Sequence, residues 1–111
     1  MSYSVDITSF FKKDLKRLHK RYKSIIDDVN ELVLSVKENP LQGVDLGNGL
    51  RKIRLRISSK GKGKSGGARV ITFVAVISQT EGKVSFLAIY DKSEKENITD
   101  SELKDLLSAL F

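Results

Sequence analysis

The segment RVITFVAVIS, residues 69–78, constrains the fold of this chain more than any other part of its sequence. It is apolar at odd and even positions alike, which is typical of a strand that is buried on both faces. Such a strand lies in the interior of a sheet. LRKIRLRI, residues 50–57, precedes it, and KVSFLAIY, residues 83–90, follows after a short turn at QTEG. We therefore expect three consecutive strands, with residues 69–78 as a central strand.

The first part of the chain predicts one more strand and two helices. Apolar and polar side chains alternate over residues 3–7, as in a half-buried strand. Ser9 is expected to cap a helix whose apolar stripe reaches Tyr22, and Ser24 to cap a second helix that ends before Pro40. Two amphipathic helices with so short a join predict a helical hairpin.

The remaining segments complete the predicted domain. LQGVDLGNG, residues 41–49, is rich in turn-forming residues and predicts a loop. Thr99 and Glu102 have the spacing of a capping box, so a last helix should begin there, with its leucines against the core or a partner. The order strand-helix-helix-strand-strand-strand-helix over residues 1–111 predicts one small α+β domain. Its sheet should be mainly antiparallel and packed against the helical hairpin.

The composition excludes several kinds of chemistry. The chain has no cysteine, so it has no disulfide, thiol nucleophile or thiolate metal site. Its one histidine, His19, is expected on the surface, and we expect no metal and no cofactor. No apolar run approaches the roughly 18 residues of a membrane span, and the first residues do not resemble a signal peptide. We expect a cytoplasmic protein without a membrane partner.

The positive charge of the chain is concentrated in one segment. The formal net charge is +6, and residues 46–80 contain eight basic residues and no acidic one. Concentrated basic charge favours a polyanionic partner, whereas diffuse charge mainly affects solubility.

The basic segment includes a glycine-rich loop, SSKGKGKSGGARVI, residues 58–71. Gly61, Gly63 and Gly66 match G-x-G-x-x-G, but a dinucleotide-binding loop must lead into a helix, and this loop leads into a strand. Nucleotide binding is therefore not favoured. The alternatives are a flexible connection between two strands and a contact site for phosphate groups.

The strand before this loop carries a row of cations. Side chains alternate between the faces of a strand, so Lys52, Arg54 and Arg56 point to one side and the three apolar residues between and after them to the other. A solvated face would explain the row by itself. A binding surface would explain the row together with the glycine-rich loop.

The segments LRKIRLR, GKGKSGGARVI and YDKSEKENIT resemble the RelE/ParE superfamily of bacterial toxins, and within it the RelE-like and HigB-like mRNA interferases. The resemblance covers nearly the whole chain. It implies a RelE-like fold and a toxin that acts as a ribosome-dependent mRNA endoribonuclease. The implied partners are a cognate antitoxin, the 70S ribosome and mRNA in the ribosomal A site.

The resemblance also implies roles for individual residues. Lys52 is expected to act as base, Arg54 to bind the scissile phosphate, and Arg69 to clamp the phosphorane from the start of its strand, where it should pack little of the core. RelE has a further arginine and a stacking tyrosine that this chain lacks, so Lys92 or Lys95 is expected to supply the cation and Tyr90 the aromatic surface. Glu94 is either a base or an ion-pair partner of Lys92 or Lys95. Further RNA contacts are expected from Arg51, Arg56, Lys60, Lys62 and Lys64.

Two other functions are compatible with the same sequence. A ParE-like gyrase inhibitor would have the same fold but would bind a protein and cleave nothing. A non-catalytic nucleic-acid-binding module would need only the basic strand and the glycine-rich loop. Lys52, Arg54 and Arg69 together favour the nuclease, because gyrase binding does not require them.

Overall fold

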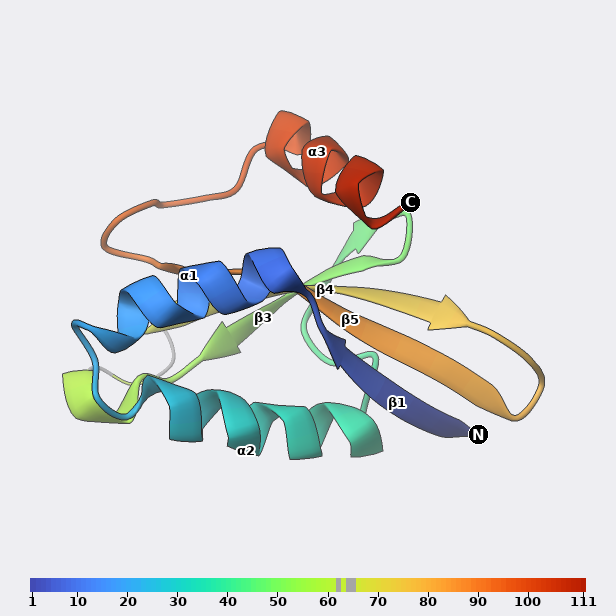
Figure 1. The fold of residues 1–111 in the computed structure, drawn as a ribbon, viewed down its shortest axis with the longest axis horizontal. Coiled ribbons are helices and arrows are strands. Elements are labelled where there is room, and N and C mark those ends of the chain that lie inside the picture. Colours follow the sequence, from blue (N-terminus) through green and yellow to red (C-terminus); the bar gives the residue numbers. More distant parts are fainter. Residues whose placement is uncertain (62, 64–65) are drawn as a thin grey trace.

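The computed structural model describes residues 1–61, 63 and 66–111. In this part of the chain, one sheet has the strand order β1-β5-β4-β3-β2 (Figure 1). The strands are β1 (Ser2–Ile7), β2 (Val44–Gly47), β3 (Leu50–Leu55), β4 (Ala68–Val76) and β5 (Glu81–Asp91). The helices are α1 (Ser9–His19), α2 (Ile25–Glu38) and α3 (Asp100–Leu110), and a short 3-10 turn, η1 (Ser58–Lys60), follows β3.

The strand β4 lies in the middle of the sheet, as its apolar sequence predicts. It pairs antiparallel with β3 on one side and with β5 on the other, and β2 pairs antiparallel with β3. The strand β1 joins the outer side of β5 in parallel. The sheet is therefore mainly antiparallel, which confirms the α+β prediction.

The prediction of a loop over residues 41–49 is wrong in part, because Val44–Gly47 forms β2. The chain reverses between Gly47 and Leu50 through Asn48 and Gly49, whose φ angles are +54° and +82°. Two positive φ angles define a type I′ hairpin turn, for which Asn-Gly is a preferred pair. The Asn-Gly pair was thus a signal for a hairpin within this segment.

The sheet carries helices on both faces. The helices α1 and α2 cover one face, where Phe11 and Phe86 pack edge to face with their ring centroids 5.4 Å apart. The helix α3 lies against the other face, where Leu103 joins a smaller cluster that includes Ile71. Figure 1 shows α3 apart from the α1–α2 hairpin, at the end of the segment that follows β5. The hairpin packing and the core contact of the last helix are confirmed.

The helix starts differ from the prediction at two of the three sites. Thr8, and not Ser9, caps α1, because its hydroxyl accepts a hydrogen bond from the Phe11 N–H and donates one to the Phe86 carbonyl. Ser24 stands at the start of α2, but its hydroxyl donates to Asp28 and does not cap the helix. The capping box at Thr99 is present as predicted.

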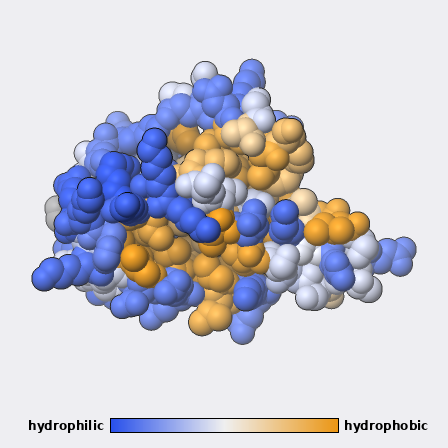
Figure 2. Space-filling model, in the orientation of Figure 1, coloured by the Kyte–Doolittle hydropathy of each residue, from blue (hydrophilic) through white to orange (hydrophobic). Residues whose placement is uncertain are grey.

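The face of the molecule that Figure 2 shows divides into a polar and a more apolar region. Figure 2 shows hydrophobic residues over α3 and between α1 and α2, while hydrophilic residues gather at the end of the molecule where α1 and η1 end. None of the helices in the described residues is long and apolar enough to span a bilayer. The polar end is also where the chain leaves β5 and where the candidate site begins.

Candidate functional site

A row of three side chains crosses the face of the sheet that carries α3. In the register of the sheet, Arg54 of β3 lies opposite Arg69 of β4, and Arg69 lies opposite Tyr90 of β5. Paired residues on neighbouring strands point to the same face, so the three side chains are neighbours. Arg54 is exposed, whereas Arg69 is 4% exposed and Tyr90 is 6% exposed. The row therefore runs from solvent into the protein.

One pocket collects four of the five predicted catalytic residues. Lys52 and Arg54 come from β3, Arg69 from β4, and Lys92 from the turn after β5. The rest of the lining is Val44, Glu96 and Asn97. Residues that are 40 positions apart along the chain thus meet at one place, and among the described residues that line it one carboxylate accompanies four cations.

The burial of Arg69 corrects the expectation that it packs little of the core. Its position at the second residue of β4 places it between two strands, and the segment after β5 lies beside it. Burial and the charge of Arg54 lower the pKa of Arg69. One guanidinium nitrogen, Nη1, donates to the Ala68 carbonyl at 3.1 Å. The side chain is therefore oriented and desolvated, which strengthens its attraction for an anion.

Asn97 is a site residue that the sequence analysis missed. Its Oδ1 accepts a hydrogen bond from Lys52 Nζ at 3.2 Å and another from the Ile98 N–H at 3.2 Å. The side chain lines the pocket and ties the ammonium of Lys52 to the segment before α3. The only signal was its place in the polar KSEKEN segment, because the contact with Lys52 spans 45 residues.

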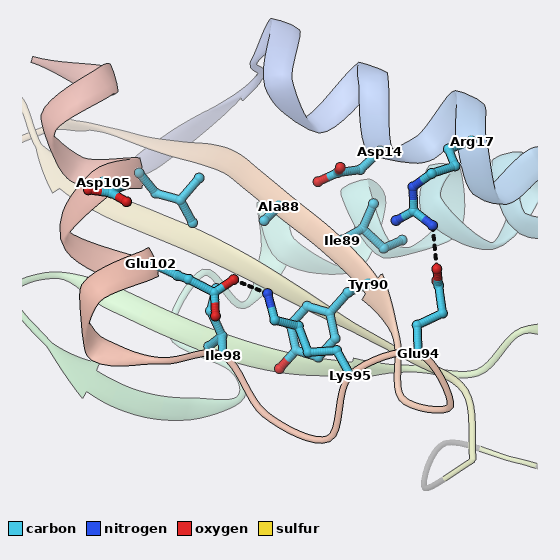
Figure 3. Close-up of a pocket in the computed structure, with 11 residues that line it drawn as sticks. Asp14, Arg17, Ala88, Ile89, Tyr90, Glu94, Lys95, Ile98, Glu102 and Asp105 are labelled. Carbon is cyan, nitrogen blue, oxygen red and sulfur yellow. Dashed lines mark hydrogen bonds and ion pairs between the residues drawn. The ribbon is translucent and has the colours of Figure 1, made fainter.

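The structure separates Lys95 from the other predicted catalytic residues. Figure 3 shows a second pocket, between α1, β5 and α3, in which Lys95 points toward Glu102 of α3 and forms an ion pair with it. Lys95 Nζ also lies 5.5 Å from the centroid of the Tyr90 ring. The side chain therefore links the segment after β5 to α3 and lies outside the pocket that holds Arg69.

The prediction that Tyr90 offers an aromatic surface for a base is wrong for this structure. The ring is covered by the segment after β5, from which Lys95 and Ile98 line the same pocket. Burial raises the pKa of Tyr90, against the opposing effect of the Arg69 charge. Tyr90 contributes here to the wall behind Arg69.

Glu94 has a different partner from the two that the sequence analysis considered. Its carboxylate pairs with Arg17 of α1 at 2.5 Å, as Figure 3 shows. It lines the same pocket as Asp14, whose pKa is raised by burial. This position, away from the four-cation pocket, does not favour Glu94 as a base in that pocket.

The other predicted RNA-binding residues occupy several environments. Arg51 turns away from the pocket and donates from Nε to the Gln42 carbonyl at 3.1 Å and from Nη2 to the Gly43 carbonyl at 3.0 Å, so it holds the start of β2. Arg56 is exposed beyond the end of β3. Lys60 is partly buried and forms an ion pair with the buried Asp91 carboxylate at 2.7 Å, so it is engaged within the protein. Lys62 and Lys64 lie outside the described residues.

The fold and the site define a small α+β protein with a cationic pocket on an otherwise covered sheet. Comparison with known proteins places it: residues 8–109 match the model of the family described as the RelE toxin of the RelE/RelB toxin-antitoxin system. The chain belongs to this family and is a toxin of a toxin-antitoxin system. A mutant of the E. coli toxin RelE, solved in the free state, has the same fold, with a TM-score of 0.59 and 16% sequence identity over 100% of both chains.

Proposed function

We propose that this toxin is an endoribonuclease that cleaves mRNA in the ribosomal A site and so inhibits translation. The observation that carries the proposal is the meeting of Lys52, Arg54, Arg69 and Lys92 in one pocket. A phosphodiester is the ligand that such a set of ammonium and guanidinium groups suits best. The family of the chain supports the same reading, because its model describes a toxin of this kind of system.

The chemistry follows from what RNA cleavage requires. The 2′-hydroxyl loses its proton and attacks the adjacent phosphorus, the phosphorane gains charge, and the 5′-oxygen leaves with a proton. We assign Lys52 to accept the first proton. Arg69, whose fork is oriented and desolvated, stabilises the phosphorane. Arg54, on the solvent side of Arg69, binds the incoming phosphate, and Lys92 supplies a further cation.

The described residues place no histidine in this pocket, since His19 lies at the end of α1 and is exposed. Lysine and arginine therefore carry the acid–base and electrostatic work in this proposal. Either Lys92 or Lys52 protonates the leaving 5′-oxygen. Lys52 would do so by returning the proton that it accepted from the 2′-hydroxyl. No metal ion or cofactor is part of the proposed reaction.

The proposed partners are mRNA, the 70S ribosome and the antitoxin. A surface with concentrated positive charge attracts the RNA-rich A site, and the attraction should weaken as salt rises. The same surface suits an antitoxin segment that is acidic or amphipathic, because covering or neutralising these cations would silence the toxin. The length of the glycine-rich loop, residues 58–71, favours the HigB-like branch of the superfamily over the RelE-like branch.

Cleavage of a reporter mRNA during translation in vitro tests the proposal. Primer extension should show cuts inside the translated frame, and they should disappear when ribosomes are omitted. Equal cutting of free RNA would contradict the ribosome requirement. Inhibition of gyrase supercoiling without any cut would favour a ParE-like toxin, and RNA binding without either effect would favour a non-catalytic module.

A further inference from the structure

The last residue of β5, Asp91, holds a buried carboxylate that the proposed reaction does not use. Asp91 is 0% exposed. Its oxygens accept hydrogen bonds from Lys60 Nζ at 2.7 Å, from the Ser93 N–H at 3.1 Å and from the Tyr22 hydroxyl. We propose that Asp91 is a positioning residue of the proposed cleavage site: it fixes the turn that carries Lys92 and the root of the glycine-rich loop in one arrangement. The inference rests on the proposed function.

The first part of this role concerns the turn after β5. The Asp91 carboxylate accepts from the Ser93 N–H, and its carbonyl accepts from the N–H groups of Glu94 and Lys95 at 3.0 Å and 3.2 Å. The Lys92 N–H in turn donates to the Gly67 carbonyl at 3.1 Å. These bonds fix the backbone on both sides of Lys92. Because the Asp91 and Lys92 side chains leave opposite sides of the chain, Lys92 enters the cationic pocket while Asp91 stays on the α1–α2 side.

The second part concerns the glycine-rich loop. Lys60 is the last residue of η1, at the root of that loop, and its ammonium also lies 5.5 Å from the centroid of the Tyr22 ring. The same turn is tied to α2, because Asp28 accepts from the N–H and the hydroxyl of Ser58 at 2.9 Å and 2.6 Å. Asp91 therefore joins the loop root, the corner between α1 and α2, and the Lys92 turn at one buried point.

The charged state of the Asp91 carboxylate suits its role as a hydrogen-bond acceptor that holds these segments in place. Burial raises the pKa of Asp91, but the hydrogen bonds from Lys60, Tyr22 and Ser93 outweigh it and hold the pKa well below the ordinary carboxyl range. The group is thus an anion wherever the protein is folded at neutral pH. Breaking a buried ion pair lowers stability, so the effect of Asp91 on the position of Lys92 has to be measured separately from its effect on folding.

A double-mutant cycle on RNA cleavage tests the inference. Lys92→Ala should slow cleavage about tenfold or more in the wild-type background. In the Asp91→Asn background it should slow cleavage less than about threefold, because a displaced Lys92 already contributes little to the reaction. Arg54→Ala is the matched control, since Arg54 sits on β3 and not on the turn, and its cost should be similar in both backgrounds. An unchanged cost of Lys92→Ala in the Asp91→Asn background would show that Asp91 is only structural and would overturn the inference.

Two further measurements keep the test decisive. Amide hydrogen exchange at Ser93, Glu94 and Lys95 should be faster in Asp91→Asn, and unchanged exchange would contradict the inference even for a toxin that cleaves no RNA. Failure of the wild type to cleave RNA would instead remove the proposed function. Should Asp91→Asn fail to fold, Tyr22→Phe removes one donor to the same carboxylate and should shift both readouts in the same direction by a smaller amount. No shift in either readout would count against the inference.

Discussion

Arg54 and Arg69 face each other directly across β3 and β4. Like charges in directly opposed positions of a sheet destabilise it, and here one of the two is almost fully buried. Burial, and after it the charge of Arg54, lowers the pKa of Arg69. The free protein thus holds a repulsive pair that an anion between the two guanidinium groups would relieve. This pair supports the phosphate site that we propose for the pocket.

Removal of the repulsion should stabilise the free protein and weaken its activity. Arg54→Gln keeps the length and the polar end of the side chain and is expected to raise the free energy of unfolding by about 0.5 kcal/mol. Cleavage should fall at the same time. Urea unfolding and mRNA cleavage in the same preparation measure both effects. Arg56→Gln, an exposed position beyond the end of β3, is the control, and a loss of stability specific to Arg54→Gln would contradict the account.

The buried position of Arg69 decides which substitution is informative. Arg69→Ala would leave a cavity and an altered wall beside Tyr90, so loss of activity could arise from misfolding. Arg69→Lys keeps the charge but loses the planar fork, and we expect cleavage to fall about 10²-fold with the fold intact. Circular dichroism melting and single-turnover cleavage separate the two effects. Full activity with lysine would rule out a bidentate clamp.

Asn97 is expected to affect the rate of cleavage by orienting Lys52. Lys52→Ala is expected to slow cleavage about 10²-fold, whereas Asn97→Ala removes the hydrogen bond that orients Lys52 and should slow cleavage about three- to tenfold. In the Lys52→Ala background the Asn97 substitution should add little, because the group that it orients is gone. Single-turnover rates of the four proteins test this expectation. Independent effects of the two substitutions would contradict the role given to Asn97.

The lysines of the glycine-rich loop should divide into two groups. Neutralising Lys62 and Lys64 together is expected to weaken ribosome or RNA binding and to flatten its dependence on salt. Lys60→Met should instead lower stability, because it leaves the Asp91 carboxylate buried without its cation. Binding at several salt concentrations and thermal melting measure the two outcomes. An unchanged salt dependence after the double substitution would make the loop a plain connection between strands.

Acid should reveal the depressed pKa of Asp91. A carboxylate whose pKa is lower in the folded than in the unfolded state adds stability above the unfolded value, about 3.9, and this stability is lost as pH falls toward the folded value. The free energy of unfolding of the wild type should therefore decline below about pH 5. The decline should be smaller in Asp91→Asn. Parallel curves for the two proteins below that pH would contradict the assignment.

Local sequence patterns predicted most of this fold, because the signal for each of these elements lies in residues close together in the sequence. The two-faced apolar run of β4, the alternation in β3 and the capping box at Thr99 are all readable within a few positions. The short strand β2 was missed because the glycines of its segment were read as loop formers, although Asn48 and Gly49 specify a hairpin turn.

The site was predictable only in part. The resemblance to the toxin superfamily named the four cations of the pocket, but burial depends on which distant segments cover a residue. Tyr90 is hidden by the segment before α3, and Lys60 is engaged by a carboxylate 31 positions away. Asn97 and Tyr22 meet their partners across 45 and 69 residues. No periodicity along the chain reports such contacts.

Single-turnover cleavage of an mRNA positioned in the ribosomal A site tests the central claim most directly. The wild type and Arg56→Lys, which keeps a charge outside the four-cation pocket, should cut at the same position and at similar rates. Arg69→Lys should bind the ribosome but cut about 10²-fold more slowly. Equal cleavage by all three proteins, or no cleavage by the wild type, would contradict the claim that this pocket is the catalytic site of a ribonuclease.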